Sequence, residues 1–586
     1  MKQFIMDKSN LKSRKIWGDG VPTVLSVSPV VGLWRHSRLE MSLIEQLVQQ
    51  EVRVIALSCD GHAISSCSNI DLYESTGRQN SRLQACTECI VRDSARQNVL
   101  ASQGVEFVEI PPHPNFDVWL SEQNIEDPES IIWQEMEVGR YSCYDLALNL
   151  KCEPQQVPVI ARRQYVEALN TAISIFSVVS DICLNQRVDI VTFHNGLLTL
   201  NRTAWEWCKL HGIQTIDIMN VSDLVYRDSK YYLNNDLWPL FYGNKDDGWE
   251  IVKEWRLNAV ELDFVDSYLE SELKLGGIKK YGAGEVVKHQ KIENRGSHDF
   301  IILCLFNSED ERKTAKFVHI NENEKYESFW DHLDLSLKLA NTYPQCKFIF
   351  RLHPRMGKSR TGNASPYLEQ VQKILKNPPE NVQVIFPDHK VSLNDSLELC
   401  NLVVSYGSTA GLLASASGKP VILGSARFDW NFPKEIYFIP NSFSFNEIAK
   451  LIDRFVDLRV QPHEIYTTTA FAQKAINYIH NILTLDFIME KNSKIQILVS
   501  VINPIFWIKA WGRLRTYRSE GLQVRAWLSY FKIAYNSFAN TRGKVTQTRE
   551  FEVWQEIIKH SKKSLSKILV ESYQKKYESI QGASRV

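Results

Sequence analysis

The segment from 403 to 411, Val-Val-Ser-Tyr-Gly-Ser-Thr-Ala-Gly, constrains the fold more than any other part of this sequence. Its apolar start predicts a short buried strand, its small polar residues a turn, and the Ala/Leu/Ser-rich continuation a helix. The first amides of such a helix lack intrahelical partners and carry the positive end of its dipole, so they favour an anion. Gly407 permits close approach to the backbone, and Ser408 and Thr409 either cap the helix or bind a phosphate.

A second strand is predicted upstream, in Phe348-Ile-Phe-Arg-Leu-His-Pro-Arg355, and it ends at His353. Ligands of open α/β sheets bind beyond the carboxyl ends of the strands. The two turns are therefore predicted to form one phosphate site that includes the His353 imidazole, Gly407, Ser408 and Thr409. Arg351 joins this set only if the alternation of side chains along the strand directs it toward the ligand.

Composition describes a folded globular protein, with 44% hydrophobic and 23% charged residues. Lys+Arg and Asp+Glu are equal at 68 each, so net charge gives no argument for nucleic acid. The first residues lack the apolar core of a secretory signal, and no run of about twenty uncharged apolar residues appears. Eleven cysteines, an odd number, suggest reduced thiols, and the cytoplasm is the expected compartment.

Alternating strand and helix patterns predict two α/β domains of Rossmann-like type that face each other across a cleft. The first, expected at 20–250, carries a helical insert at 111–187. The second, expected at 299–485, contains both turns described above.

Residues 490–586 differ in character and are expected to form a helical extension, basic and aromatic. Pro504 and Lys509 argue against a spanning helix there. The apolar stretch 495–511 therefore either lies flat at a bilayer surface or packs on the body of the protein.

Several short motifs together resemble the capsular and surface polysaccharide biosynthesis proteins. These are GT-B glycosyltransferase-like chains, akin to the Kdo transferases and bacterial polysialyltransferases with a His-Pro motif. The resemblance covers about residues 20–485. It is carried by Arg-Leu-His-Pro (351–354), Tyr-Gly-Ser-Thr-Ala-Gly (406–411), Gly-Lys-Pro-Val-Ile (418–422), Ser-Cys-Asp-Gly (58–61), Cys-Thr-Glu-Cys (86–89) and Phe-His-Asn-Gly (193–196) followed by Arg202.

The resemblance implies a transferase that moves a sugar from a nucleotide-activated donor to a glycan or lipid-linked glycan acceptor. Cytidine nucleotides, CMP- or CDP-linked, are the favoured donors over UDP, and the apolar stretch 495–511, if it lies at a bilayer, would place the protein at the inner face of the plasma membrane. In these relatives the His-Pro histidine and the Ser/Thr turn hold the donor phosphate, which corresponds to His353, Ser408 and Thr409. A CDP-polyol (glycerophosphate) transferase and a non-catalytic scaffold of a polysaccharide assembly complex remain as alternatives.

Glycosyl transfer needs stabilisation of the leaving phosphate and a base for the acceptor hydroxyl. The phosphate residues named above suit the first need without a metal, and no cofactor is expected. Asp60, which stands before Gly61 as the acidic residue does in the resembling polysialyltransferases, is the candidate base, with His62 and Glu40 as rivals.

Two strand-end turns carry the remaining candidates. Asn195 and Gly196 are expected to contact the acceptor. Glu309 either caps a helix or borders the donor site.

Four cysteines in the first domain could form a structural zinc site. Cys86 and Cys89 form a Cys-x-x-Cys pair, a fair zinc half-site, while the spacing of Cys59 and Cys67 is not a familiar one. Either the four converge on a structural zinc ion, or they are free buried thiols.

Overall fold

A computed structural model describes residues 21–30, 34–59, 81–220, 230–234, 247–273, 299–318, 328–357, 366–389, 391–425, 432–482 and 484–486. The chain divides into two compact units. Of the described residues, the first unit takes those within 21–145 and 161–219, and the second takes those within 146–160 and 220–485. The extension expected at 490–586 lies outside the described residues.

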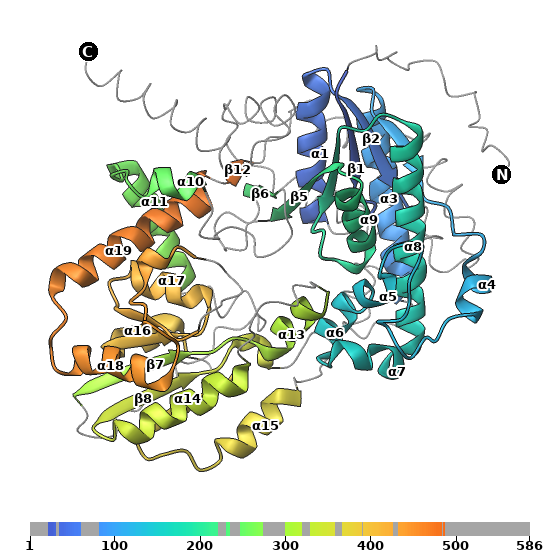
Figure 1. Ribbon diagram of the computed structural model, residues 1–586. Helices are drawn as coiled ribbons and strands as arrows, with labels where there is room; N and C mark the ends of the chain where they lie inside the picture. The colour runs from blue at the N-terminus through green and yellow to red at the C-terminus, as the bar shows by residue number, and fades with distance from the viewer. Residues whose placement is uncertain are drawn as a thin grey trace, which may run out of the picture. The chain divides into compact units, whose positions relative to one another are not determined.

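The first unit is built on five parallel strands in the order β5-β4-β1-β2-β3 (Figure 1). Their bounds are β1 Thr23–Val27, β2 Arg53–Ser58, β3 Glu106–Glu109, β4 Ile190–His194 and β5 Gln214–Asn220. Two further short strands, β6 (Lys230–Asn234) and β12 (Thr484–Asp486), are described outside this set of five. Every residue of β1 and β4 is buried, as expected for strands covered on both faces.

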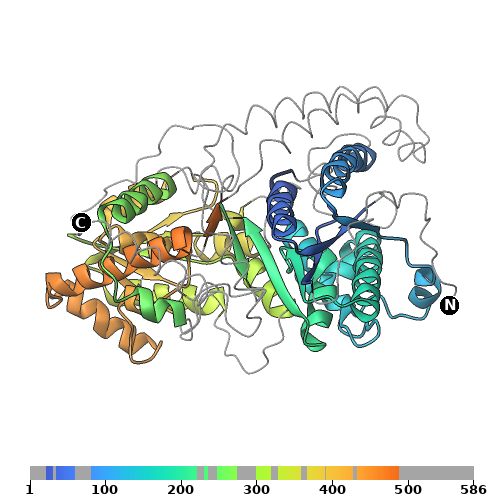
Figure 2. The same ribbon diagram turned by 90° about the horizontal axis from the view of Figure 1, so that it is seen from above.

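Helices cover both faces of the first sheet. The strand order reverses after β3, so right-handed crossovers put the helices before and after that point on opposite faces. Figure 2 shows this arrangement, with the blue helices α1 and α3 on one side of the strands and the teal helices α8 and α9 on the other. The helices of this half of the chain are α1 Trp34–Gln49, α3 Ser81–Ala101, α4 Phe116–Ser121, α5 Val138–Tyr141, α6 Tyr144–Leu150, α8 Arg162–Asn185 and α9 Thr199–Leu210. The segment 146–160, which groups with the second unit, adds η2 Pro154–Gln156 and α7 Val157–Ile160.

Helix α8 is, among the described helices, the one long and apolar enough to cross a membrane by length and composition. Of its apolar stretch, 61% is buried inside the protein. Phe176 of α8 packs edge-on against Trp207 of α9, with ring centroids 6.1 Å apart. These contacts are those of a core helix.

The second unit is built on five parallel strands in the order β11-β10-β7-β8-β9. Their bounds are β7 Phe300–Leu305, β8 Cys346–Arg351, β9 Val382–Ile385, β10 Leu402–Ser405 and β11 Val421–Leu423. The helical elements around them are α10 Asp247–Val252, α11 Ala259–Ser271, α13 Glu309–Val318, α14 Phe329–Thr342, η4 Pro354–Met356, α15 Pro366–Ile374, α16 Leu393–Leu399, α17 Thr409–Ala416, η5 Lys434–Ile436, α18 Phe445–Val456, α19 Pro462–Asn477 and η6 Tyr478–Ile482.

Tyr406 anchors the core of the second unit directly behind the turn that the sequence singled out. Its ring is fully buried and stacks on Phe306 and on His332, with centroids 5.4 and 4.5 Å away. Its hydroxyl shares a 2.7 Å hydrogen bond with Ser336 of α14, so its polar tip is satisfied inside the core. The predicted class, two Rossmann-like parallel α/β units, is confirmed.

Gly411 of α17 offers a direct test of how tightly this helix packs on β10. A β-carbon at Gly411 would lie 2.5 Å from Ser405 Oγ and 2.9 Å from Ser405 Cβ. Alanine is preferred over glycine in helices by about 1 kcal/mol, yet this overlap reverses the preference. Gly411→Ala should lower the free energy of unfolding by about 1–3 kcal/mol, measured by urea denaturation.

The double variant Ser405→Gly/Gly411→Ala is the control, because it removes both atoms that the new methyl group would meet. It should lose less stability than the sum of the two single variants. Additive losses would show that steric overlap is not the cause.

Candidate functional site

The strand order of the second unit reverses between β7 and β10, and the sequence-predicted turns lie at this switch point. In the parallel registers Leu305 of β7 is level with Arg351 of β8 on one side and Ser405 of β10 on the other. The three strands therefore end side by side at one edge of the sheet. This is where open α/β sheets bind ligands.

The turn between β10 and α17 has the geometry that the sequence indicates. Gly407 adopts φ +83°, a backbone conformation that side chains disfavour. Ser408 is the N-cap of α17, and its Oγ accepts a 3.2 Å hydrogen bond from the amide of Ala410. Gly411 donates its amide to the Ser408 carbonyl. In the described part of the chain no acceptor is found for the amide of Thr409, the first helical residue, so it remains able to bind a ligand.

The end of β7 lies between the two predicted turns. Asn307 and Ser308 are buried there, and Asn307 Nδ2 donates to the carbonyl of Tyr406. Adjacent strands are about 4.8 Å apart, so the ends of β8 and β10 are separated by about 10 Å. The two turns thus share one edge as predicted, but a single phosphate group is too small to span both backbones. Asn307 and Ser308, which the sequence analysis did not single out for this role, occupy the intervening position.

The side chain of Glu309, directly after Ser308, binds residues inside the second unit. It is fully buried, Oε2 accepts a 2.9 Å hydrogen bond from the Phe329 amide at the start of α14, and Oε1 lies 4.0 Å from Lys313 Nζ. Of the two roles predicted for Glu309, helix capping is the one with a visible contact, and the helix it caps is α14.

His353 and Arg351 diverge at the end of β8. His353 is half-buried and directly precedes η4, whose Met356 amide bonds the His353 carbonyl. The Arg351 guanidinium turns to the N-terminal end of α16, where it donates to the carbonyls of Val391 and Ser392 and to Ser396 Oγ, at 3.0 to 3.4 Å. Burial lowers the pKa of Arg351 to about 10. These contacts give Arg351 a structural role and do not support the predicted phosphate contact.

In the first unit, the turn after β4 is held by the carboxyl groups of two aspartates, Asp217 and Asp145. Asn195 adopts φ +54°, an uncommon conformation for a residue with a side chain. The neighbouring amide of Gly196 donates to Asp217 Oδ1 of β5 at 2.7 Å, and the amide of Thr199 donates to Asp145 Oδ2 at 2.9 Å. The turn that contains the predicted pair Asn195 and Gly196 is thus held by one hydrogen bond at Gly196 and another at Thr199.

Asp217 carries the strongest electrostatic perturbation at this turn. It is completely buried, and burial raises its pKa to about 8 against the lowering effects of the Gly196 and Asn195 amides and of Arg202. Burial likewise raises the pKa of Asp145 to about 6. Asp217 was not among the predicted site residues. The available signal was an aspartate between two isoleucines, Ile216 and Ile218, inside a predicted strand.

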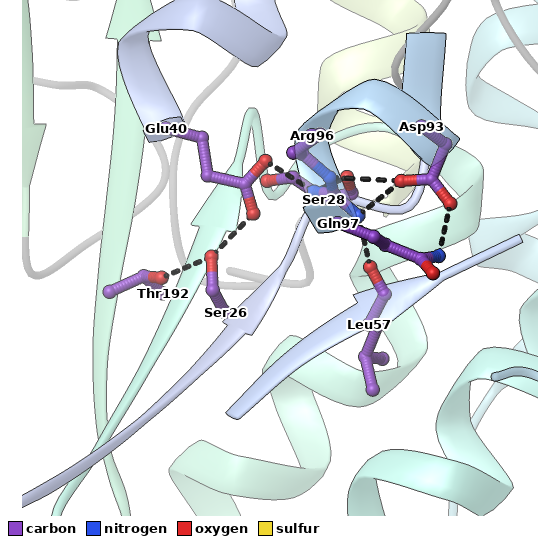
Figure 3. A network of polar contacts seen from close by, with 8 residues as sticks. All are labelled: Ser26, Ser28, Glu40, Leu57, Asp93, Arg96, Gln97 and Thr192. Carbon is purple, nitrogen blue, oxygen red and sulfur yellow. Dashed lines mark hydrogen bonds and ion pairs between the residues drawn. The ribbon is translucent and has the colours of Figure 1, made fainter. Parts of the chain in front are cut away.

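A buried ionic network lies beside the ends of β1 and β2 (Figure 3). Arg96 of α3 pairs with Glu40 of α1 at 3.0 Å and with Asp93 at 2.8 Å, and it donates to the carbonyls of Ser28 and Leu57. All three ionic side chains are at most 1% exposed.

Glu40 is therefore committed to this network. Its Oε1 also accepts from Ser26 Oγ at 2.6 Å, and Ser26 accepts from Thr192 of β4. Burial raises the pKa of Glu40, opposed by the Arg96 charge. A carboxylate with these partners is unsuited to act as the acceptor base, so Glu40 is removed as a rival for that role.

The remaining predicted residues are placed only in part. Asp60, His62 and Cys67 lie outside the described residues. Cys59 and Cys86 are buried and Cys89 is half-buried, none of them in a disulfide. No group of three or more potential metal ligands occurs within the described part of the chain, and the zinc hypothesis, which needs Cys67, stays a prediction.

Comparisons with known proteins assign no family to this chain. No protein-family model and no curated protein matches the sequence. One solved structure similar to this chain is the glycosyltransferase of kitacinnamycin, at 13% identity over 78% of this chain and 95% of that one, with a TM-score of 0.24. The UDP-GlcNAc 2-epimerase from Neisseria meningitidis, bound to UDP-GlcNAc, matches at 12% over 79% and 99%, with a TM-score of 0.25.

The Thermosulfurimonas dismutans β Kdo 2,4 transferase KpsC matches at 12% over 45% of this chain and 78% of that one, with a TM-score of 0.26. Likenesses at such TM-scores determine neither the fold nor the reaction of this chain. Both have to be inferred from its own residues.

Arg351→Met tests the structural role of this arginine. The variant leaves the carbonyls of Val391 and Ser392 and the hydroxyl of Ser396 without their donor, which should cost about 2–3 kcal/mol of unfolding free energy. Nucleotide binding by the folded fraction should be unchanged in a titration. Loss of binding with unchanged stability would instead return Arg351 to the phosphate site.

Asp217→Asn tests the buried carboxyl of the first unit. The folded protein holds a proton on Asp217 up to about pH 8, whereas the unfolded chain releases it near pH 4. Stability should therefore fall as pH rises through this window, by up to about 1.4 kcal/mol per pH unit. The asparagine variant should flatten this dependence in urea unfolding at pH 5, 6, 7 and 8.

Asp181→Asn, which changes an exposed carboxylate of α8, is the matched control and should keep the wild-type slope. An unaltered slope in Asp217→Asn would mean that Asp217 is not the group that titrates.

Proposed function

We propose that this chain is a GT-B glycosyltransferase that transfers a sugar from a nucleotide-activated donor to a glycan acceptor. The observation that carries the proposal is the switch point of the second unit. There the Gly407–Thr409 turn, the Asn307–Ser308 segment and His353 occupy three neighbouring strand ends. The resemblance of residues 351–354 and 406–411 to surface polysaccharide biosynthesis proteins supports the same conclusion.

The chemistry of this edge suits a leaving group that carries phosphate. Negative charge develops on the phosphate as the glycosidic bond breaks, and preorganised donors aimed at that charge lower the barrier. The Thr409 amide, the positive end of α17 and the hydroxyls of Ser408 and Thr409 provide such donors at one end of the edge. His353 provides an imidazole at the other end. A whole nucleotide, whose sugar and phosphate extend over several ångströms, fits a span of about 10 Å better than an isolated phosphate does.

On the acceptor side, the proposal assigns the turn at Asn195 and Gly196 to acceptor binding. The carboxyl groups of Asp217 and Asp145 hold this turn in one conformation, which suits a recognition element. Asp60 is kept as the proposed base for the acceptor hydroxyl.

The finer assignments are part of the proposal. They are a cytidine-linked donor, CMP or CDP, a role in capsule or surface polysaccharide assembly, and a cytoplasmic location at the inner face of the plasma membrane. The donor and the role follow from the resemblance of the motifs, and the location from the apolar stretch 495–511. The donor phosphate is held without a metal in this proposal, because amides, hydroxyls and an imidazole supply the stabilisation.

Nucleotide binding to the full chain is the direct test. A ligand that binds only the folded state raises the apparent melting temperature by mass action. Titration with CMP, CDP, UDP, GDP and ADP should give a shift with one base, cytidine expected. In His353→Ala the shift should shrink or vanish, and turnover with the matching sugar nucleotide should fall by a factor on the order of 100.

His463→Ala is the matched control, since it removes an exposed histidine of α19 in the same unit. It should bind nucleotide as the wild type does. Absence of a shift with all five nucleotides would overturn the proposal and favour a non-catalytic scaffold. Transfer of a polyol phosphate with release of CMP would identify the other transferase class.

A further inference from the structure

A strongly acidic surface stands out in the first unit. Residues 111–137, here called the acidic lobe, contain seven carboxylates and no lysine or arginine. All seven are at least partly exposed: Asp117, Glu122, Glu126, Asp127, Glu129, Glu135 and Glu137. Helix α4, which Figure 1 labels, forms one part of this lobe.

An aromatic cluster holds the acidic lobe in shape. Trp133 makes edge contacts with His113 and Trp119, at centroid distances of 4.7 and 5.0 Å, and Trp119 also contacts Phe116. The amides and carbonyls of Trp133 and Met136 bond each other at 2.9 to 3.0 Å and close a tight turn. The lobe therefore has a defined backbone, from which its carboxylates extend.

Apolar side chains are exposed among these charges. Val118 is 67% exposed and Ile132 is 40% exposed, while Trp119 and Trp133 are half-buried. Apolar and aromatic groups beside charged ones are typical of surfaces that bind a partner.

Neighbouring basic side chains contact this surface at only three of its carboxylates. Glu126 lies 4.0 Å from Arg162, Glu137 lies 3.7 Å from Arg140, and Glu135 lies 3.5 Å from His211. Within the described residues no lysine or arginine pairs with the four other carboxylates of the lobe. A basic partner would find four uncompensated charges here.

The same chain carries a partner of complementary composition. Residues 487–586 contain 18 lysines and arginines against 7 acidic residues, a net charge of +11. Since the whole chain is balanced at 68 each, residues 1–486 carry a net charge of −11. This basic segment also contains Trp507, Trp511, Trp527 and Trp554, and arginine and tryptophan are the residue types most enriched at binding hot spots.

We propose that the basic segment 487–586 docks on the acidic lobe of its own chain. Single exposed ion pairs contribute only about 0–1 kcal/mol each, so one contact would not suffice between separate molecules. Attachment to the same chain raises the effective concentration to the order of millimolar, and several weak contacts then act together. Exposed charges are screened over about 8 Å at physiological ionic strength, so the contact is sensitive to salt.

Carbodiimide cross-linking of the full chain, read out by mass spectrometry, tests the proposal. The reagent activates a carboxylate, a lysine amine displaces it to form an amide, and the carbodiimide leaves as its urea. At low salt, lysines of 487–586 should be linked mainly to carboxylates of the acidic lobe. At 1 M salt, where the screening length is about 3 Å, these links should fall about fivefold or more.

A charge-neutralised variant gives the matched comparison. Asp117→Asn/Glu122→Gln/Glu129→Gln should reduce the links at the carboxylates it retains, Glu126, Asp127 and Glu135. Neutralising three exposed carboxylates of the second unit, Asp334→Asn/Glu380→Gln/Glu398→Gln, should leave those links at the wild-type level.

Three results would overturn the proposal. One is a set of links spread evenly over exposed carboxylates of both units. Another is a yield that does not respond to salt. The third is an isotopically mixed set of linked peptides when labelled and unlabelled chains are combined, since the segment would then dock on a second copy.

Discussion

Parallel pairing of strands is the constraint on which both units of this protein depend. In a parallel sheet every strand ends at the same edge, so residues far apart in sequence meet there. Arg351, Leu305 and Ser405 are brought level in this way, although they are distributed over about a hundred residues of chain. The reversal of strand order beside β7 and beside β1 then sets where the switch point of each unit lies.

The two edges are stabilised by different means. In the second unit the apolar ring of Tyr406 packs behind the turn, and hydrogen bonds of neutral groups complete it. In the first unit, buried ionised or ionisable groups stabilise the edge. Arg96 binds the ends of β1 and β2, and Asp217 binds the turn after β4. Buried charges need complete sets of partners, so a change to one partner is costly. The first edge should therefore be the more sensitive to pH and to isosteric substitution.

Much of the fold could be predicted because its signals are local. The apolar runs of β7, β8 and β10, and the small-residue turn before α17, correspond to predicted elements. The N-cap role of Ser408 was one of the two readings that the sequence allowed. Glu309 and Arg351 could not be assigned in the same way. Their partners, the first amide of α14 and the segment before α16, become neighbours only when the chain folds.

The sequence alone determined the alternation of strands and helices, and with it the parallel α/β class and the Gly407–Thr409 turn. These follow from periodicity and turn chemistry, which act over a few residues. Only the tertiary structure decided which side chains remain available at the strand ends. In the folded chain, Arg351, Glu309 and Glu40 bind internal partners, and Asn307 lies between the two predicted turns. Asp217 accepts a hydrogen bond from the amide of Gly196, next to Asn195. Such choices depend on burial and on contacts across strands, which no local pattern encodes.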